Sequence, residues 1–171
     1  MAKYIGIDPS TKTGLVILND DGSVFLNEEV KTKVDSDPGR FMDIASQVMN
    51  TIHVECHEED VKIMIENFSF GSKGRAVSTQ YGIGWAIRIE LVKHGLPYTE
   101  VAPGGLKKFA SGKGNTKKDE LVLPIYKKWG FESNSDNVRD AYVLAQIGRY
   151  LDGLDEPTKY QEDVLKKVSG S

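Results

Sequence analysis

The sequence of 171 residues has little of several features that mark special classes of protein. Its single cysteine, Cys56, excludes any disulfide within the chain and fits a reducing compartment. No apolar run approaches the roughly 20 residues that span a bilayer, and the first residues lack the charged and apolar segments of a secretion signal. We therefore expect a soluble protein of the cytoplasm without a membrane partner.

The sequence also lacks a strong net charge, at −3, so any preference for a charged partner depends on how the charges are distributed. That distribution is uneven. Residues 107–128 contain seven lysines and two acids, whereas residues 19–60 and 132–163 are mostly acidic. Such a basic patch is either an ordinary solvated surface or a contact for a polyanion.

The length and the 39% of hydrophobic residues suit one domain with an ordinary core. We place this domain at residues 1–152. Residues 153–171 are polar, include Pro157, and predict a C-terminal tail that is either helical or frayed.

Hydrophobic periodicity predicts a succession of strands and helices along the domain. Apolar runs rich in β-formers predict strands at residues 3–8, 15–18, 23–30, 61–66 and 98–102. Helical spacing predicts helices at residues 41–52, 75–94, 116–129 and 136–147, with a lysine-rich loop at 103–118. This order indicates an α/β domain in which helices flank a mixed five-stranded sheet whose first strands are antiparallel.

Two of the predicted strands end in a carboxylate, Asp8 and Glu66. Burying a carboxylate is costly unless it is paired or bound to a cation. Asp136 and Asp140 follow at a helical i, i+4 spacing, so the sequence offers four carboxylates for Mg²⁺, which prefers oxygen ligands. Three or four acids are enough for two ions of the kind that catalyse phosphodiester hydrolysis. A turn residue at Asp8 and a helix N-cap at Asp136 are the alternative interpretations.

Two flexible segments offer contacts to a nucleic acid. Phe68, Ser69 and Phe70 follow Glu66 in a polar glycine loop, where the rings either pack on the core or stack on an unpaired base. Lys113 lies between two glycines in a second loop that suits a phosphate backbone.

A zinc site is a weaker interpretation. His53 and His57 stand at an i, i+4 spacing, but the sequence offers no second pair of ligands because His94 is the only other histidine. We therefore do not expect zinc.

Four motifs occur in order along residues 3–150: Ile5 to Gly14, Ile65 to Asn67, Leu106 to Lys118, and Asp140 with Ala141. In this order they resemble RuvC-type Holliday junction resolvases of the ribonuclease H-like superfamily, particularly the smaller phage-borne branch. The resemblance implies a ribonuclease H-like fold. It also implies a homodimer that nicks two strands of a four-way DNA junction symmetrically with Mg²⁺ or Mn²⁺, and phage-borne members tend to cut branched DNA more broadly.

The resemblance further implies roles for individual residues. Asp8, Glu66 and Asp140 correspond to metal ligands, whereas Lys107 and Lys118 correspond to residues that contact the scissile region. Further DNA contacts are expected from Phe68, Ser69, Phe70, Lys73, Arg75, Lys108, Lys113 and Lys117. Whether accessory branch-migration proteins take part is left open.

The sequence departs from this family at two positions. Asn137 stands where the family has its remaining acid, so Asp136 is the expected substitute, and Asn137 could still orient a metal-bound water. Ser69 stands where bacterial members have an aromatic wedge, which leaves Phe68 or Phe70 for that role.

Three other functions share features with this sequence. A ribonuclease H acting on RNA–DNA hybrids would use the same carboxylates, whereas the full set of acids argues against a non-catalytic junction-binding or structural protein. An ATPase of the actin and sugar-kinase superfamily also begins with a Gly-Ile-Asp strand, but such a fold needs two domains and this length supplies one.

Overall fold

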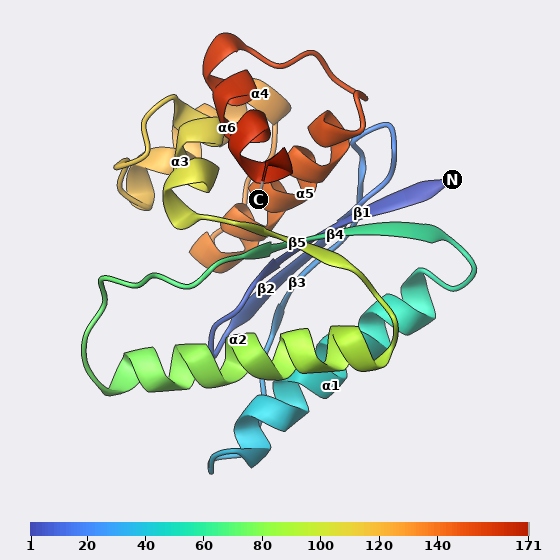
Figure 1. The fold of residues 1–171 in the computed structure, drawn as a ribbon, viewed down its shortest axis with the longest axis vertical. Coiled ribbons are helices and arrows are strands. Elements are labelled where there is room, and N and C mark those ends of the chain that lie inside the picture. The colour runs from blue at the N-terminus through green and yellow to red at the C-terminus, as the bar shows by residue number, and fades with distance from the viewer. Residues whose placement is uncertain (171) are drawn as a thin grey trace.

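A mixed five-stranded sheet forms the centre of the molecule in the computed structural model, which describes residues 1–170 (Figure 1). The strands lie in the order β3-β2-β1-β4-β5. Pairing is antiparallel between β1 and β2 and between β2 and β3, and parallel from β1 through β4 to β5. The bounds are Ala2–Asp8 for β1, Thr13–Leu18 for β2, Val24–Val30 for β3, Asp60–Glu66 for β4 and Tyr98–Val101 for β5. The predicted mixed sheet with antiparallel first strands is confirmed.

Helices cover both faces of this sheet (Figure 1). Helices α1 (Gly39–Glu55) and α2 (Arg75–Lys93) pack on one face, against side chains such as Ile5 and Ile7. The other face, which includes Tyr4 and Met64, is covered by α3 (Pro103–Ser111), α4 (Val122–Trp129), α5 (Asp136–Leu151) and α6 (Lys159–Ser169). Within residues 1–170, no helix is both long and apolar enough to cross a membrane.

Two expectations for the C-terminal half need revision. The predicted loop at 103–118 is wrong for its first half, because Pro103 begins helix α3, whose Leu106 and Phe109 are buried. Proline suits this first position since its missing N–H has no partner there in any helix. The predicted helix at 116–129 begins later, with a 3₁₀ turn at Asp119–Leu121 before α4.

Residues after Asp152 were expected to be helical or frayed, and part of them forms α6. Val164 of this helix is buried against the core, and the side chain of Gln161 donates a hydrogen bond to the carbonyl of Phe109 at 3.3 Å. A capping box at Thr158 starts the helix. Helix α6 therefore packs against helix α3.

Helix α5 approaches the sheet through two glycines. A Cβ at Gly6 of β1 would lie 1.8 Å from the carbonyl oxygen of Ala141, and one at Gly14 of β2 would lie 2.0 Å from that of Asn137. No real side chain fits at such distances, so these two positions require glycine. The backbone of α5 consequently lies directly on the ends of β1 and β2.

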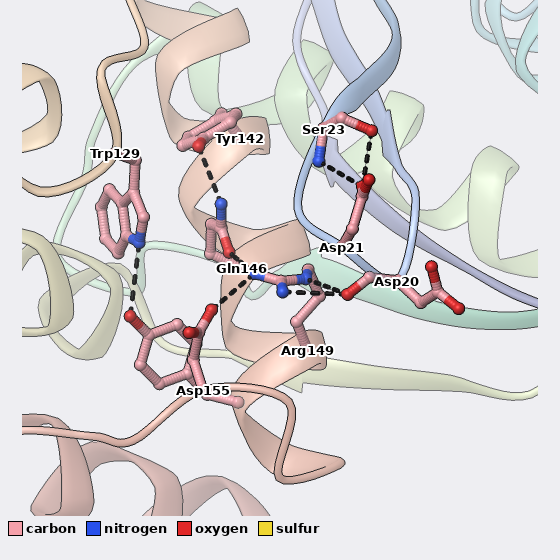
Figure 2. A network of polar contacts seen from close by, with 9 residues as sticks. Asp20, Asp21, Ser23, Trp129, Tyr142, Gln146, Arg149 and Asp155 are labelled. Atoms are coloured by element: carbon pink, nitrogen blue, oxygen red, sulfur yellow. Dashed lines mark hydrogen bonds and ion pairs between the residues drawn. The ribbon is translucent and has the colours of Figure 1, made fainter.

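A buried arginine fixes the far end of α5 (Figure 2). Arg149 donates two hydrogen bonds to the carbonyl of Asp20, at 2.9 and 3.1 Å, and one each to Gln146 and Asp155 at 2.8 Å. Gln146 in turn donates to the hydroxyl of Tyr142 at 2.7 Å. The network joins the β2–β3 turn and the segment after α5 to one helix, which fixes the helix relative to the sheet.

Candidate metal centre and nucleic-acid interface

Three carboxylates converge at one edge of the sheet. Asp8 and Glu66 end the parallel neighbours β1 and β4, in which Ile7 lies opposite Ile65. Side chains alternate along strands, so both carboxylates share the α5 face of the sheet, and the glycine contacts of α5 bring Asp140 to the same place. Oxygen atoms from the three side chains all lie within 4.8 Å of one another. In the described part of the chain, this is the single group of three acid, histidine or cysteine side chains so arranged.

The electrostatics of this triad favour a bound cation. Burial raises the pKa of Asp8 well above its usual value, and the charges of Glu66 and Asp140 add to the shift. Burial and the charge of Asp140 raise the pKa of Glu66 to about 7. Burial also raises the pKa of Asp140 to about 6, although the charge of Lys118 opposes that shift. A divalent cation relieves this repulsion, and the all-oxygen donor set fits Mg²⁺ or Mn²⁺.

Asp136, the expected fourth ligand, lies outside the triad. Its carboxylate accepts a hydrogen bond from the Lys118 ammonium at 2.9 Å. The bond holds the pKa of Asp136 below its usual value. The alternative interpretation of Asp136 as a helix N-cap is wrong, because the hydroxyl of Ser135 caps α5 by accepting from the amide of Val138.

Asn137, which the sequence resemblance aligns with an acid, is a structural link in this chain. Its amide nitrogen donates to the hydroxyl of Ser10 at 3.0 Å and to the carbonyl of Lys12 at 2.8 Å. The residue therefore fastens the β1–β2 turn to α5.

The lysines of the basic segment divide into two groups. Lys107 and Lys118 both act electrostatically on Glu66 and Asp140, so their ammonium groups lie near the triad. Lys113 and Lys117 are exposed. Lys108 pairs with Asp163 of α6 at 3.5 Å.

The loop after β4 separates its two phenylalanines. Phe68 packs inward, with its ring centroid 4.9 Å from that of Tyr81, while the side chain of Phe70 is 80% exposed. Ser69 between them is exposed, and its carbonyl accepts a hydrogen bond of 3.4 Å from the Tyr81 hydroxyl. Of the two alternatives given for these rings, packing on the protein therefore applies to Phe68, whereas Phe70 is exposed and can contact a partner. Lys73 and Arg75 are exposed where the loop enters α2.

Arg88 of α2 is a residue that the sequence analysis missed. It is only 2% exposed, and its guanidinium donates to the carbonyls of Glu66 at 3.2 Å and Gly84 at 2.9 Å and to the carboxylate of Glu100 at 2.9 Å. It also lies 4.3 Å from the ring centroid of Phe68. Arg88 thus holds the end of β4 and the loop that follows. Its only sequence signal is its position beside Ile87, on the buried side of an amphipathic helix.

An open groove of about 500 Å³, which we call the catalytic groove, runs along the Asp8 and Glu66 side of the triad. Asp8 and Glu66 form part of its wall, together with Lys118 and Asp136. The remaining lining comes from Asn137 of α5, from the β1–β2 turn with Ser10, Thr11 and Lys12, and from the N-terminal parts of α1 and α2 with Arg40, Ala76, Thr79 and Gln80. None of the last four was a sequence candidate.

The histidines lie at a different pocket. His53, His57 and His94 line a pocket of about 400 Å³ together with Cys56. Among residues 1–170, no three of these side chains approach one another closely enough to share a metal ion.

The strand order and the helices on both faces define a ribonuclease H-like fold, as predicted. No model of a protein family and no curated sequence matches the chain. Among solved structures, the chain is similar to RuvC from Thermus thermophilus, with a TM-score of 0.69 and 20% identity over 90% of this chain and 98% of that one.

Two further structures share this fold. The same bacterial RuvC in complex with a Holliday junction substrate matches with a TM-score of 0.70 and 18% identity, over 92% of this chain and 100% of that one. The yeast mitochondrial Holliday junction resolvase Ydc2 matches with a TM-score of 0.52 and 13% identity, over 95% of this chain and 83% of that one. At these identities, the similarity defines the fold.

Proposed function

We propose that this protein is a metal-dependent, structure-selective DNA endonuclease that resolves four-way junctions, and cuts other branched DNA, by paired phosphodiester hydrolysis. The observation that carries the proposal is the convergence of Asp8, Glu66 and Asp140 within 4.8 Å, at the edge of a ribonuclease H-like sheet. The structural similarity to a RuvC bound to a Holliday junction substrate supports the choice of DNA. Membership of the phage-borne branch and residence in the cytoplasm rest on the sequence alone.

The triad would hold Mg²⁺ or Mn²⁺, with two ions in each site. Held by these carboxylates, such ions would supply an activated water nucleophile and positive charge against the scissile phosphate. The three side chains supply negative charge where it is costly without a cation, which favours loading of the site. Asp8 and Asp140 are buried, so their side chains have little conformational freedom to lose when a cation binds.

Lys107 and Lys118 would neutralise charge that develops on the scissile phosphate. Although burial opposes it, the hydrogen bond with Asp136 and the nearby carboxylates raise the pKa of Lys118 above its usual value. The lysine is therefore fully charged at neutral pH. Lys113 and Lys117 are exposed and unpaired by any acid in the described residues, which suits longer-range contacts with the DNA backbone.

The loop after β4 would contact the branch point. Phe70 is exposed and follows Glu66 in the same loop, and an exposed ring can stack on an unpaired base. Phe68 would support the loop from below through its contacts with Tyr81 and Arg88. Lys73 and Arg75 continue the same exposed loop with positive charge.

A homodimer is the expected assembly, with α2 at its interface. Trp85, Ile89 and Val92 form an exposed apolar stripe along the outer side of this helix. A second copy of the chain would bury the stripe, since isologous contact of like apolar faces is the commonest closed assembly. Two active sites on one dimer would account for paired nicks.

Cleavage of several labelled substrates by the wild type and Asp8→Asn tests this proposal. The substrates are a four-way junction, a flap, a linear duplex and an RNA–DNA hybrid. We expect paired, metal-dependent nicks in the junction, which Asp8→Asn abolishes while binding persists. A preference for the hybrid would identify a ribonuclease H instead. Binding of junctions without cleavage in both Mg²⁺ and Mn²⁺ would identify a non-catalytic binding protein.

A further inference from the structure

Part of the positive charge in the catalytic groove does not come from the lysine-rich residues 107–128. Besides Lys118, the cations that line the groove are Lys12 and Arg40. Lys12 belongs to the β1–β2 turn, and Arg40 to the first turn of α1. Lys107, Lys113 and Lys117, which come from the segment around α3, are not part of this lining. A nucleic acid strand that enters the triad therefore meets a second basic region within the same groove.

The guanidinium of Arg40 is held with one donor edge open. Its Nε and Nη2 donate to the carboxylate of Asp37 at 2.8 and 3.1 Å, and Nη2 also donates to the hydroxyl of Thr79 at 3.3 Å. Within residues 1–170, Nη1 makes no hydrogen bond. Contacts from α2 and from the segment before α1 thus fix the side chain between the two helices. A fixed arginine with a free N–H edge loses little entropy when it binds a phosphate oxygen.

Lys12 is exposed but stands on a rigid turn. Its amide donates to the hydroxyl of Ser10 at 3.0 Å, and Thr13 closes the turn with a hydrogen bond of 2.6 Å to the carbonyl of Ser10. Asn137 then fastens the turn to α5 through the carbonyl of Lys12. The helix that carries Asp140 therefore also sets the position from which the Lys12 ammonium reaches into the groove. The ammonium itself has no salt bridge among the described residues.

We propose that Lys12 and Arg40 form a second phosphate subsite, which binds a backbone phosphodiester of the cleaved strand next to the scissile phosphate. This inference rests on the proposed nuclease function and adds a position for the strand. Arg40 would donate from Nη1 to a phosphate oxygen, and Lys12 would act as a point charge. Asn137, where the resolvase family has an acid, would serve this subsite by holding the turn of Lys12.

Neutralisation of single phosphates tests the subsite directly. Four-way junctions carry one uncharged methylphosphonate at each position flanking the cleavage site, and single-turnover cleavage is measured for wild type, Arg40→Gln and Lys12→Gln. We expect one or two modified positions to slow the wild type about tenfold, as the loss of a charge-assisted hydrogen bond would. The two variants should cut unmodified DNA about tenfold more slowly and lose little more at those positions.

Two matched variants sharpen the test. Lys93→Gln removes an exposed charge at the far end of α2 and should behave as the wild type. Asp37→Asn releases Arg40 from its acid and should bind DNA several-fold more tightly at elevated salt, a gain that a merely structural role of the ion pair does not predict. Lys12→Gln changes an exposed side chain and so remains informative even if Arg40→Gln unfolds.

Equal slowing of the wild type and both variants at every modified phosphate would overturn the subsite while leaving the nuclease intact. Failure of the wild type to cut any DNA would instead reject the proposed function. Fluorescence anisotropy with the same substrates would then decide the subsite. A modified phosphate that weakens binding by the wild type but not by the variants would support it, and uniform weakening would reject it.

Discussion

Asp136 and Lys118 form a hydrogen-bonded ion pair of 2.9 Å, one turn of α5 before Asp140. The pair joins the first turn of α5 to the residue that precedes the 3₁₀ turn at Asp119–Leu121. It lowers the pKa of the acid and helps to raise that of the lysine, so both groups carry full charge. An acid near the metal centre thus acts here as the partner of a lysine.

Asp136→Asn should therefore act through Lys118, with a smaller effect than removal of the lysine itself. We expect cleavage to slow roughly tenfold because the lysine loses its fixed position, with no rise in the Mg²⁺ concentration for half-maximal rate. The double variant with Lys118→Ala should be no slower than Lys118→Ala alone. Asp140→Asn is the control that should demand more Mg²⁺. A similar demand by Asp136→Asn would place Asp136 among the ligands, as the sequence predicted.

The two groups of lysines should respond differently to substitution. Lys107→Ala or Lys118→Ala should reduce the cleavage rate roughly 100-fold with little change in affinity, because both lie near the triad. Lys113→Ala should instead weaken binding and reduce its salt slope by about 1. Rates and anisotropy titrations over a range of salt concentrations separate these effects, and equal effects at all three positions would contradict the division.

Stability without metal should depend on pH through the triad. The folded-state pKa values of Glu66, about 7, and Asp140, about 6, exceed the roughly 4 of unfolded chains. The folded state therefore binds more protons, and its stability falls as pH rises from about 4 to 7. In EDTA the melting temperature should drop across this range, and Mg²⁺ should restore it at pH 8.

Asp140→Asn supplies the control for that pH dependence. It removes one of the repelling charges, so its melting temperature in EDTA should fall less with pH and exceed that of the wild type at pH 8. A melting temperature of the wild type that rises with pH over the same range would show that the triad does not control the pH dependence of stability.

Gly6→Ala should prevent α5 from reaching the sheet. The new methyl group would lie 1.8 Å from the carbonyl oxygen of Ala141. The atoms that it meets belong to the backbone of α5, which cannot move aside as a flexible side chain could. We expect a loss of at least about 3 kcal/mol of unfolding free energy, measured by urea denaturation. Gly71→Ala is the matched control, since a Cβ there meets nothing within 4 Å. Equal stability of both variants would contradict the packing of α5.

The apolar stripe of α2 predicts a change of assembly. Ile89, 52% exposed, touches no part of the metal centre, so Ile89→Asp should yield monomers in sedimentation and single rather than paired nicks. Val54→Asp changes a side chain of 61% exposure on α1, outside the stripe, and should leave the dimer intact. A monomeric wild type would reject this interface.

The sequence alone predicted the sheet and most of its helices because those signals are local. The apolar runs that end in Asp8 and Glu66 identify strands with a carboxylate at the end. Burial of such a charge costs free energy in any fold unless the charge is paired or bound to a cation. The sequence did not predict helix α3. The helix is short, so few apolar residues mark its buried side, and the lysines and glycines around Leu106 and Phe109 are typical of a loop. Local pattern thus determined the element order and the two strand acids.

Tertiary structure decided which side chains meet. The sequence shows Asp136 and Asp140 on one helix, but only packing assigns the first to Lys118 and the second to the triad. Arg88 and Arg40 stand in unremarkable helical positions, and each acquires its role from strands and helices distant in sequence. Spacing along the sequence determines only which residues lie near one another on the same element. Distances between elements depend on tertiary contacts, such as that of Gly6 with α5. The sequence therefore determined that acids end two strands, and the fold decided which partners surround them.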